Sequence, residues 1–141
     1  MTRIAFYVGN THSLQARLRL ACKLIIEKAQ MQALHTYVHL DGYTSCQQLD
    51  ELIWTYSDLS FIPHNLAPNQ EDGVRVQLGH DYEPMENCDF LINLSNDIPE
   101  FFPRFARMAE ILDQEDAILQ AGRKRYKFYR DRGYDLDYHQ L

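Results

Sequence analysis

Short apolar runs alternate with segments of helical periodicity along most of this chain, and few architectures accommodate such an alternation. The first run, at residues 4–8, is stopped by Gly9 and Asn10, and apolar residues then recur at helical spacing to about residue 33. The runs predict strands at 4–8, 36–40, 74–78 and 89–94, with helices at about 14–33, 44–56, 100–108 and 116–132. Strands that alternate with helices are typical of a mostly parallel sheet covered on both faces. We therefore predict an α/β fold, a single three-layer domain over residues 1–141.

Capping residues and prolines restrict where individual helices and strands can begin and end. Thr11 or Ser13 is positioned to cap the first helix, and Gly133 to end the last one in the left-handed conformation. Pro63 lacks an N–H group, so a strand at 61–63 is expected only at a sheet edge. Pro103 has to lie in the first turn of the helix at 100–108. Residues 109–112 fit either a further strand or a helix end.

The composition excludes several classes of protein. Fourteen Lys and Arg residues face twenty Asp and Glu residues, a formal net charge of −6, whereas sequence-independent nucleic-acid binding needs a positive surface. No run of about 18 apolar residues is present to span a membrane, and residues 1–4 do not open a secretory signal. The cysteines are odd in number and widely spaced, which fits a reducing compartment: Cys22, Cys46 and Cys88. We expect a cytoplasmic protein that contacts no membrane.

No group of residues marks a catalytic centre, a metal site or a cofactor site. The turn at 9–13 has one glycine and no lysine, so it matches neither the dinucleotide-binding nor the P-loop pattern. His35 and His39 stand four residues apart, but no cysteine or carboxylate lies at a matching offset for zinc. Nothing marks any of the three cysteines as an activated nucleophile. We expect no catalytic residues, no metal and no cofactor.

Trp54 lies off the apolar face of its predicted helix. At about 100° per residue it falls beside polar residues of that helix rather than beside Leu49 and Ile53. Two interpretations remain open. Phe61 and Leu66 fold back to cover the indole, or the indole anchors a partner protein, as tryptophan often does at interfaces.

The terminal helix combines positive charge with an apolar border. Six of the fourteen basic residues fall within ten positions: Arg123, Lys124, Arg125, Lys127, Arg130 and Arg132. On a helical wheel, the buried face of this helix is marked by Ile118, Gly122 and Tyr129. The border of that face carries Leu119 and Tyr126. The positions next to this border around the helix are Arg130, Arg123 and Lys127. The charges alone are typical of a solvated amphipathic helix. Together with the border they fit an acidic peptide that ends in a free carboxylate, or alternatively single-stranded nucleic acid.

In combination these residues resemble the chi subunits of the bacterial DNA polymerase III holoenzyme. The resemblance is carried by Phe6-Tyr7, LDELIW at 49–54, SFIPHNL at 60–66, LINL at 91–94 and RKRYKFYR at 123–130. It implies a nucleotide-binding-like α/β fold without a nucleotide site and a non-catalytic accessory role in DNA replication. Chi-like proteins join the psi subunit of the clamp loader to the acidic C-terminal tail of single-stranded DNA-binding protein, so they meet DNA only indirectly. In some bacteria a chi-like protein also pairs with an iron–sulfur-family helicase.

The resemblance also assigns roles to individual residues. Psi would contact Trp54 and Phe61, with His64 a weaker assignment in the same motif. The tail would be held by Arg123, Tyr126, Lys127 and Arg130, with Leu112 lining its pocket. Leu119 stands at a turn where relatives can carry Lys, which leaves more of the charge contact to Arg123. The alternative is a protein that binds single-stranded nucleic acid directly.

Overall fold

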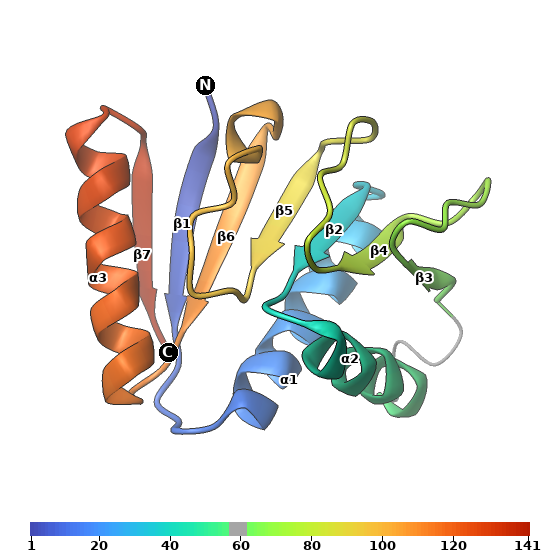
Figure 1. Ribbon diagram of the computed structural model, residues 1–141, viewed down its shortest axis with the longest axis horizontal. Helices are drawn as coiled ribbons and strands as arrows, with labels where there is room; N and C mark the ends of the chain where they lie inside the picture. Colours follow the sequence, from blue (N-terminus) through green and yellow to red (C-terminus); the bar gives the residue numbers. More distant parts are fainter. Residues whose placement is uncertain (57–61) are drawn as a thin grey trace.

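The computed structural model describes residues 1–56 and 62–141. They form one sheet of seven parallel strands with helices on both faces, the three-layer α/β fold that the sequence predicts (Figure 1). The strands lie in the order β3-β4-β2-β5-β6-β1-β7. Their bounds are β1 Arg3–Val8, β2 Thr36–His39, β3 His64–Leu66, β4 Val76–Gly79, β5 Phe90–Asn93, β6 Arg107–Leu112 and β7 Leu136–Gln140.

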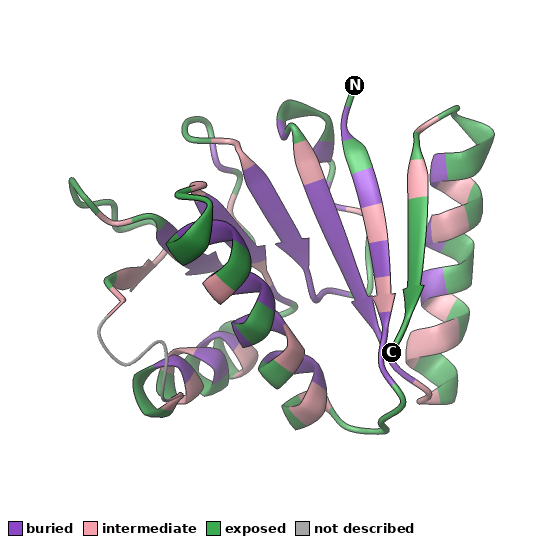
Figure 2. Ribbon diagram, turned by 180° about the vertical axis from the view of Figure 1, so that it is seen from behind, coloured by how far each residue is buried: buried purple, intermediate pink, exposed green. Residues whose placement is uncertain are grey.

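The helices divide the core into two halves. They are α1 Leu14–Ile25, continued by the π-helical turn η1 Ile26–Met31, then α2 Tyr43–Thr55, the 3-10 turn η2 Phe102–Arg104, and α3 Asp116–Asp131. Helices α1 and α2 pack against one face of the sheet, where Val38, Ile92 and Ile111 point. Helix α3 and the segment at 101–105 cover the other face, where Phe6 and Leu91 point. Figure 2 shows β5, in the middle of the sheet, buried throughout, as expected for a parallel strand covered on both faces.

The helix boundaries follow the capping residues. Ser13 accepts a hydrogen bond from the backbone N–H of Ala16 at 3.2 Å, so it is the cap of α1. Gly133 follows Arg132, the C-cap residue of α3, and has φ +81°, the left-handed conformation expected just beyond a helix end. No helix in the two described ranges is both long and apolar enough to cross a bilayer.

The structure corrects two predicted elements and adds one that was not predicted. The helix at 100–108 is wrong, because only η2 forms there and β6 already begins at Arg107. The predicted edge strand at 61–63 is displaced: the edge strand is β3, which begins at His64, directly after Pro63. Residue 61 itself lies outside the described residues. Strand β7 was not predicted, although it forms the other edge of the sheet beside β1.

Candidate protein-docking sites

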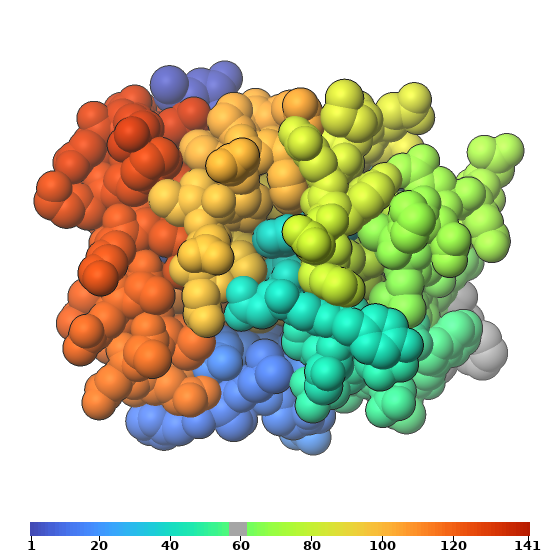
Figure 3. Space-filling view, viewed as in Figure 1, coloured from blue at the N-terminus to red at the C-terminus, as the bar shows by residue number. Residues whose placement is uncertain are grey.

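A groove with a volume of about 340 Å³ runs between α3 and the sheet. Its walls come from four elements: Phe6 of β1, Leu112 of β6, Tyr138 of β7, and Leu119, Gly122, Arg123 and Tyr126 of α3. Four of the six residues predicted to hold a tail peptide therefore line one cavity. Helix α3 stands at one side of the molecule, and its outer surface is accessible along its length (Figure 3).

The floor of the groove depends on a close approach of α3 to β6. A Cβ atom added to Gly122 would overlap the end of the Leu112 side chain, so glycine leaves the space in which this side chain reaches under the helix. Leu112 is 3% exposed and forms the apolar floor. Tyr126 packs edge-on against Phe6, with ring centroids 5.1 Å apart, and closes one side.

Arg123 supplies the charge at the rim of the groove. Its side chain is exposed and makes no ion pair or side-chain hydrogen bond within residues 1–56 and 62–141. A guanidinium group is a planar donor that matches a carboxylate in two-pronged geometry. An unpaired guanidinium beside an apolar groove is thus placed to meet an incoming anion that carries an apolar group.

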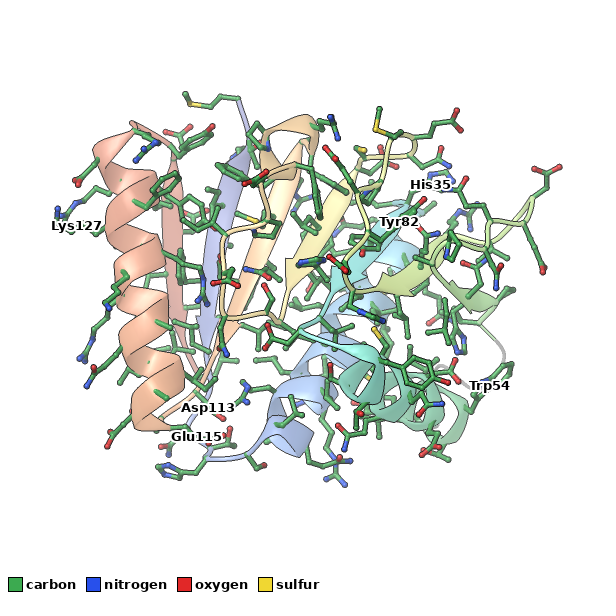
Figure 4. All side chains as sticks on the ribbon, in the orientation of Figure 1. His35, Trp54, Tyr82, Asp113, Glu115 and Lys127 are labelled. Carbon is green, nitrogen blue, oxygen red and sulfur yellow. The ribbon has the colours of Figure 1, made fainter. Side chains whose placement is uncertain are left out.

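Lys127 and Arg130 lie on α3 outside the groove and share a carboxylate. Nζ of Lys127 is 3.0 Å from Oδ2 of Asp131, and Nε of Arg130 is 3.7 Å from its Oδ1. The hydrogen bond from Lys127 lowers the pKa of Asp131 below its usual value, so this carboxylate is charged at neutral pH. Asp131 therefore offsets part of the positive charge that the sequence places on this helix. Figure 4 shows Lys127 pointing away from the sheet.

Arg125 is not part of the positive surface. It is 4% exposed, and its Nε lies 3.1 Å from Oε1 of Glu110, which is fully buried in β6. Glu110 also accepts hydrogen bonds from Tyr129 at 2.6 Å and from Asn93 at 3.1 Å. These four residues, the buried polar cluster, join α3 to β5 and β6. Burial raises the pKa of Glu110, while Arg125 and the hydrogen bonds act in the opposite direction.

Trp54 lies on the surface of α2, at the other side of the molecule from α3 (Figure 4). Trp54 is 55% exposed, and its indole packs against the ring of His64, with centroids 4.8 Å apart. The His64 side chain has no exposed area. Its Nε2 lies 2.8 Å from Oδ1 of Asp50, and its Nδ1 lies 3.0 Å from the carbonyl oxygen of Ile62. His64 therefore supports Trp54 from below instead of offering its own surface to a partner.

Trp54 is largely accessible in the structure, and the interpretation that it anchors a partner stays a prediction. Leu66 packs against the core formed with α1 and α2, and the indole keeps more than half of its surface accessible. Phe61, the other residue expected to cover or extend this surface, lies outside the described residues.

The turn after β1 is occupied by the chain's own groups. Gln114 donates from Nε2 to the carbonyl of Gly9 at 3.2 Å. Arg17, in the first turn of α1, lies 2.8 Å from Asp113 and 2.7 Å from Glu115 (Figure 4). Arg17, which lines a pocket together with residues 9–11, is thus already paired with two carboxylates. No nucleotide site is evident at the turn in the described part of the chain, which agrees with the sequence prediction.

The cysteines lack the surroundings of a nucleophile. Cys22 and Cys46 are buried, and burial raises the pKa of the Cys22 thiol to about 12 and that of Cys46 to about 11. Burial also raises the pKa of Cys88, which is partly exposed. Thiols with such values stay protonated at neutral pH and react slowly. Across the described ranges no three His, Cys, Asp or Glu side chains gather where they could hold a metal ion.

Two residues of the groove could not be assigned from the sequence. Phe6 follows the period-2 alternation of β1, so its burial was predictable, but the pattern does not show that its ring faces α3. Tyr138 belongs to β7, whose residues are mostly polar and carry no strand signal.

Comparison with known proteins identifies a family and three relatives that this chain is similar to. The family model described as "DNA polymerase III chi subunit, HolC" matches residues 1–137. The DNA polymerase III subunit chi of Pseudomonas aeruginosa is 40% identical over 141 residues, covering 100% of this chain and 98% of the relative. That of Escherichia coli is 28% identical over 126 residues, covering 88% of this chain and 85% of the relative. That of Haemophilus influenzae is 31% identical over 93 residues, covering 63% of each chain.

Proposed function

Because this chain belongs to the family of DNA polymerase III chi subunits, we propose that it is a non-catalytic adaptor between the psi subunit and the acidic C-terminal tail of single-stranded DNA-binding protein. As a chi subunit it works with the polymerase complex in DNA replication. The observation that carries the proposal is the unpaired guanidinium of Arg123 at the rim of an apolar groove. We place the protein in the cytoplasm, where replication proteins act.

The groove fits the end of a peptide chain better than its middle. Arg123 would pair with the terminal carboxylate, and the last aromatic side chain of the tail would enter the groove against Leu112, Leu119 and Tyr126. This arrangement uses the apolar floor and the cation together. Neither an internal acidic residue nor an apolar residue alone would satisfy both.

Lys127 and Arg130 would attract the acidic residues that precede the end of the tail. They lie four and seven residues after Arg123 on α3, so they extend the positive surface away from the groove. Because their side chains are solvent-exposed and share Asp131, each contributes modestly and its effect is screened by salt. An affinity in the micromolar range, about −8 kcal/mol, is expected for such a set of contacts.

The psi subunit would bind at Trp54. A half-exposed indole fixed by a buried imidazole is a preorganised apolar anchor, because little side-chain entropy is lost when a partner covers it. Phe61, three residues before His64 in the sequence, would extend this contact.

The proposal is tested by titrating a synthetic peptide of the last ten residues of the cognate single-stranded DNA-binding protein into the purified chain. We expect Arg123→Ala to weaken binding about tenfold or more, the size of a charge-assisted hydrogen-bond pair. Lys124→Ala is the matched control, because Lys124 is an exposed neighbour on α3 that does not line the groove. It should change the affinity less than twofold.

A C-terminally amidated peptide provides the second arm of this test. It should bind the wild-type chain weakly and should no longer distinguish it from Arg123→Ala. Equal affinities of the wild-type chain and Arg123→Ala for the free-acid peptide would refute the role of Arg123. Binding of single-stranded DNA at physiological salt by the isolated chain, without the peptide, would favour the nucleic-acid alternative.

A further inference from the structure

Strand β7 has an unpaired edge beside the groove. It lies last in the sheet order and pairs only with β1. In the described part of the chain, no backbone hydrogen bond joins its outer side to another segment. An open strand edge is a row of free N–H and C=O groups that a second extended chain can complete.

The direction of each backbone group along β7 follows from two hydrogen bonds. The carbonyl of Asp135 accepts from Ile4, and the N–H of Leu141 donates to Val8, so odd-numbered residues face β1. Backbone groups of a strand alternate in direction with a period of two. The N–H and C=O groups that face outward are therefore those of Leu136, Tyr138 and Gln140.

Tyr138 links this free edge to the groove. Its Cα is in register with that of Phe6, and both side chains line the groove on the α3 side of the sheet. The same residue therefore offers its side chain to the groove and its backbone to an added strand. A peptide whose last side chain enters the groove would lie with its main chain along β7.

The two edges of the sheet differ in how they are protected. Strand β3, at the opposite edge, is three residues long and lies between Pro63 and Pro68, which cannot donate hydrogen bonds. Strand β7 has five residues and no proline, and its last four residues are exposed. Proline and short length are the usual means by which an edge is closed to further strands, and β7 lacks both.

We propose that the tail peptide binds as an eighth, parallel strand on the outer edge of β7. This inference rests on the proposed function, since the occupant is the acidic tail with its free carboxylate. Its direction follows from charge: the carboxylate at Arg123 and the upstream acids near Arg130 make the peptide run opposite to α3. Because α3 connects parallel strands β6 and β7, it runs against them, and the peptide runs with β7.

The spacing of the cations fits this arrangement. Seven residues of helix separate Arg123 from Arg130, a rise of about 10 Å at roughly 1.5 Å per residue. About three residues of extended chain cover the same length at roughly 3.3 Å each. An acidic side chain about three positions before the end of the tail would thus reach Arg130.

The first experiment is a backbone N-methyl scan of the tail peptide against the wild-type chain. Each N-methyl group removes one donor, so strand addition predicts that alternate positions lose affinity about three- to tenfold while those between them change little. A scan without alternation would overturn the proposal. The unmodified peptide and Arg123→Ala are measured in parallel, so a failure of tail binding itself is recognised separately.

The second experiment compares Tyr138→Pro with Tyr138→Ala. Both variants lack the aromatic ring, but only proline removes the outward N–H, which is not used for pairing with β1. We expect Tyr138→Pro to bind the peptide about three- to tenfold more weakly than Tyr138→Ala, with both variants folded by circular dichroism. Equal affinities would overturn the proposal. A concentration-dependent dimer that Tyr138→Pro abolishes without affecting the peptide would instead assign this edge to a second copy.

Discussion

Replacing Arg125 by Met should destabilise the chain strongly, because it leaves the Glu110 carboxylate buried without its cation. Removal of one partner from a buried ion pair costs roughly 3–5 kcal/mol. We expect the lower end, about 3 kcal/mol at pH 7, since Tyr129 and Asn93 still donate to the carboxylate. Unfolding entropy of about 2.1 cal/mol/K per residue over 141 residues converts this loss into a fall in Tm of about 10 °C.

The loss should depend on pH in a defined direction. Burial raises the pKa of Glu110 in the folded chain above its ordinary value near 4.5, so the folded state holds the proton more tightly than the unfolded state does. The contribution of Glu110 to the free energy of unfolding is therefore fully present below its ordinary pKa and is lost as the pH rises through its folded-state pKa. Arg125 lowers the folded-state pKa of Glu110, so removal of Arg125 raises that pKa further. The destabilisation should be greatest near pH 8 and should shrink towards pH 5.

Thermal unfolding followed by circular dichroism between pH 5 and pH 8 measures both effects. The matched control is Arg123→Met, the same substitution on the same helix at an exposed position, which should change stability by about 0.5 kcal/mol or less. In the double variant Glu110→Gln/Arg125→Met, most of the loss at pH 7 should be recovered because the buried charge is gone. If Arg125→Met and Arg123→Met lose equal stability, or the loss is independent of pH, the account of the buried polar cluster is wrong.

Two further substitutions test the docking surfaces. Asp131→Asn removes the carboxylate shared by Lys127 and Arg130, so the affinity for the tail peptide should rise about twofold at low salt. This gain should disappear at high salt, and peptide titrations at two ionic strengths measure the difference. Trp54→Ala should abolish co-purification of psi and leave the affinity for the tail peptide unchanged. The free energy of unfolding should change by no more than about 1 kcal/mol, because Trp54 is already half-exposed. Parallel loss of tail binding would show that the variant is not folded.

The sequence predicts elements whose signal is local. Strands β1, β2, β4 and β5 are short apolar runs between turn residues. Helices α1, α2 and α3 have helical periodicity, with Ser13 capping the start of α1 and Gly133 following the end of α3. The same logic misjudged residues 100–108. Phe101, Phe102 and Phe105 have a spacing that a helix would also produce, but in the structure they fill the core beside β5 and β6 around a single 3-10 turn. Tertiary packing, not local periodicity, decides that segment.

The groove shows a second limit of sequence reasoning. The apolar border of α3 was predictable from its periodicity, but the partner that closes the groove on the sheet side is Tyr138, in a strand of mostly exposed residues. Such a strand forms because β1 presents an unpaired edge, and that edge is a property of the fold rather than of residues 136–140. Arg125 illustrates the same point, since charge alone placed it on the surface. Its spacing from Gly122 and Tyr129 is the signal that it faces the core.

The positions of the two surfaces in the strand order explain how one small domain could serve as an adaptor. The Trp54 surface adjoins β3 at one edge of the sheet, and the groove adjoins β7 at the other. Six intervals between neighbouring strands, each about 4.8 Å, separate these edges by roughly 29 Å. Partners bound at the two edges would use separate surfaces, so neither contact would require the residues of the other. Each strand between the two edges is paired on both sides within one continuous sheet. Under the proposed function, this sheet would be the spacer that links the two contacts.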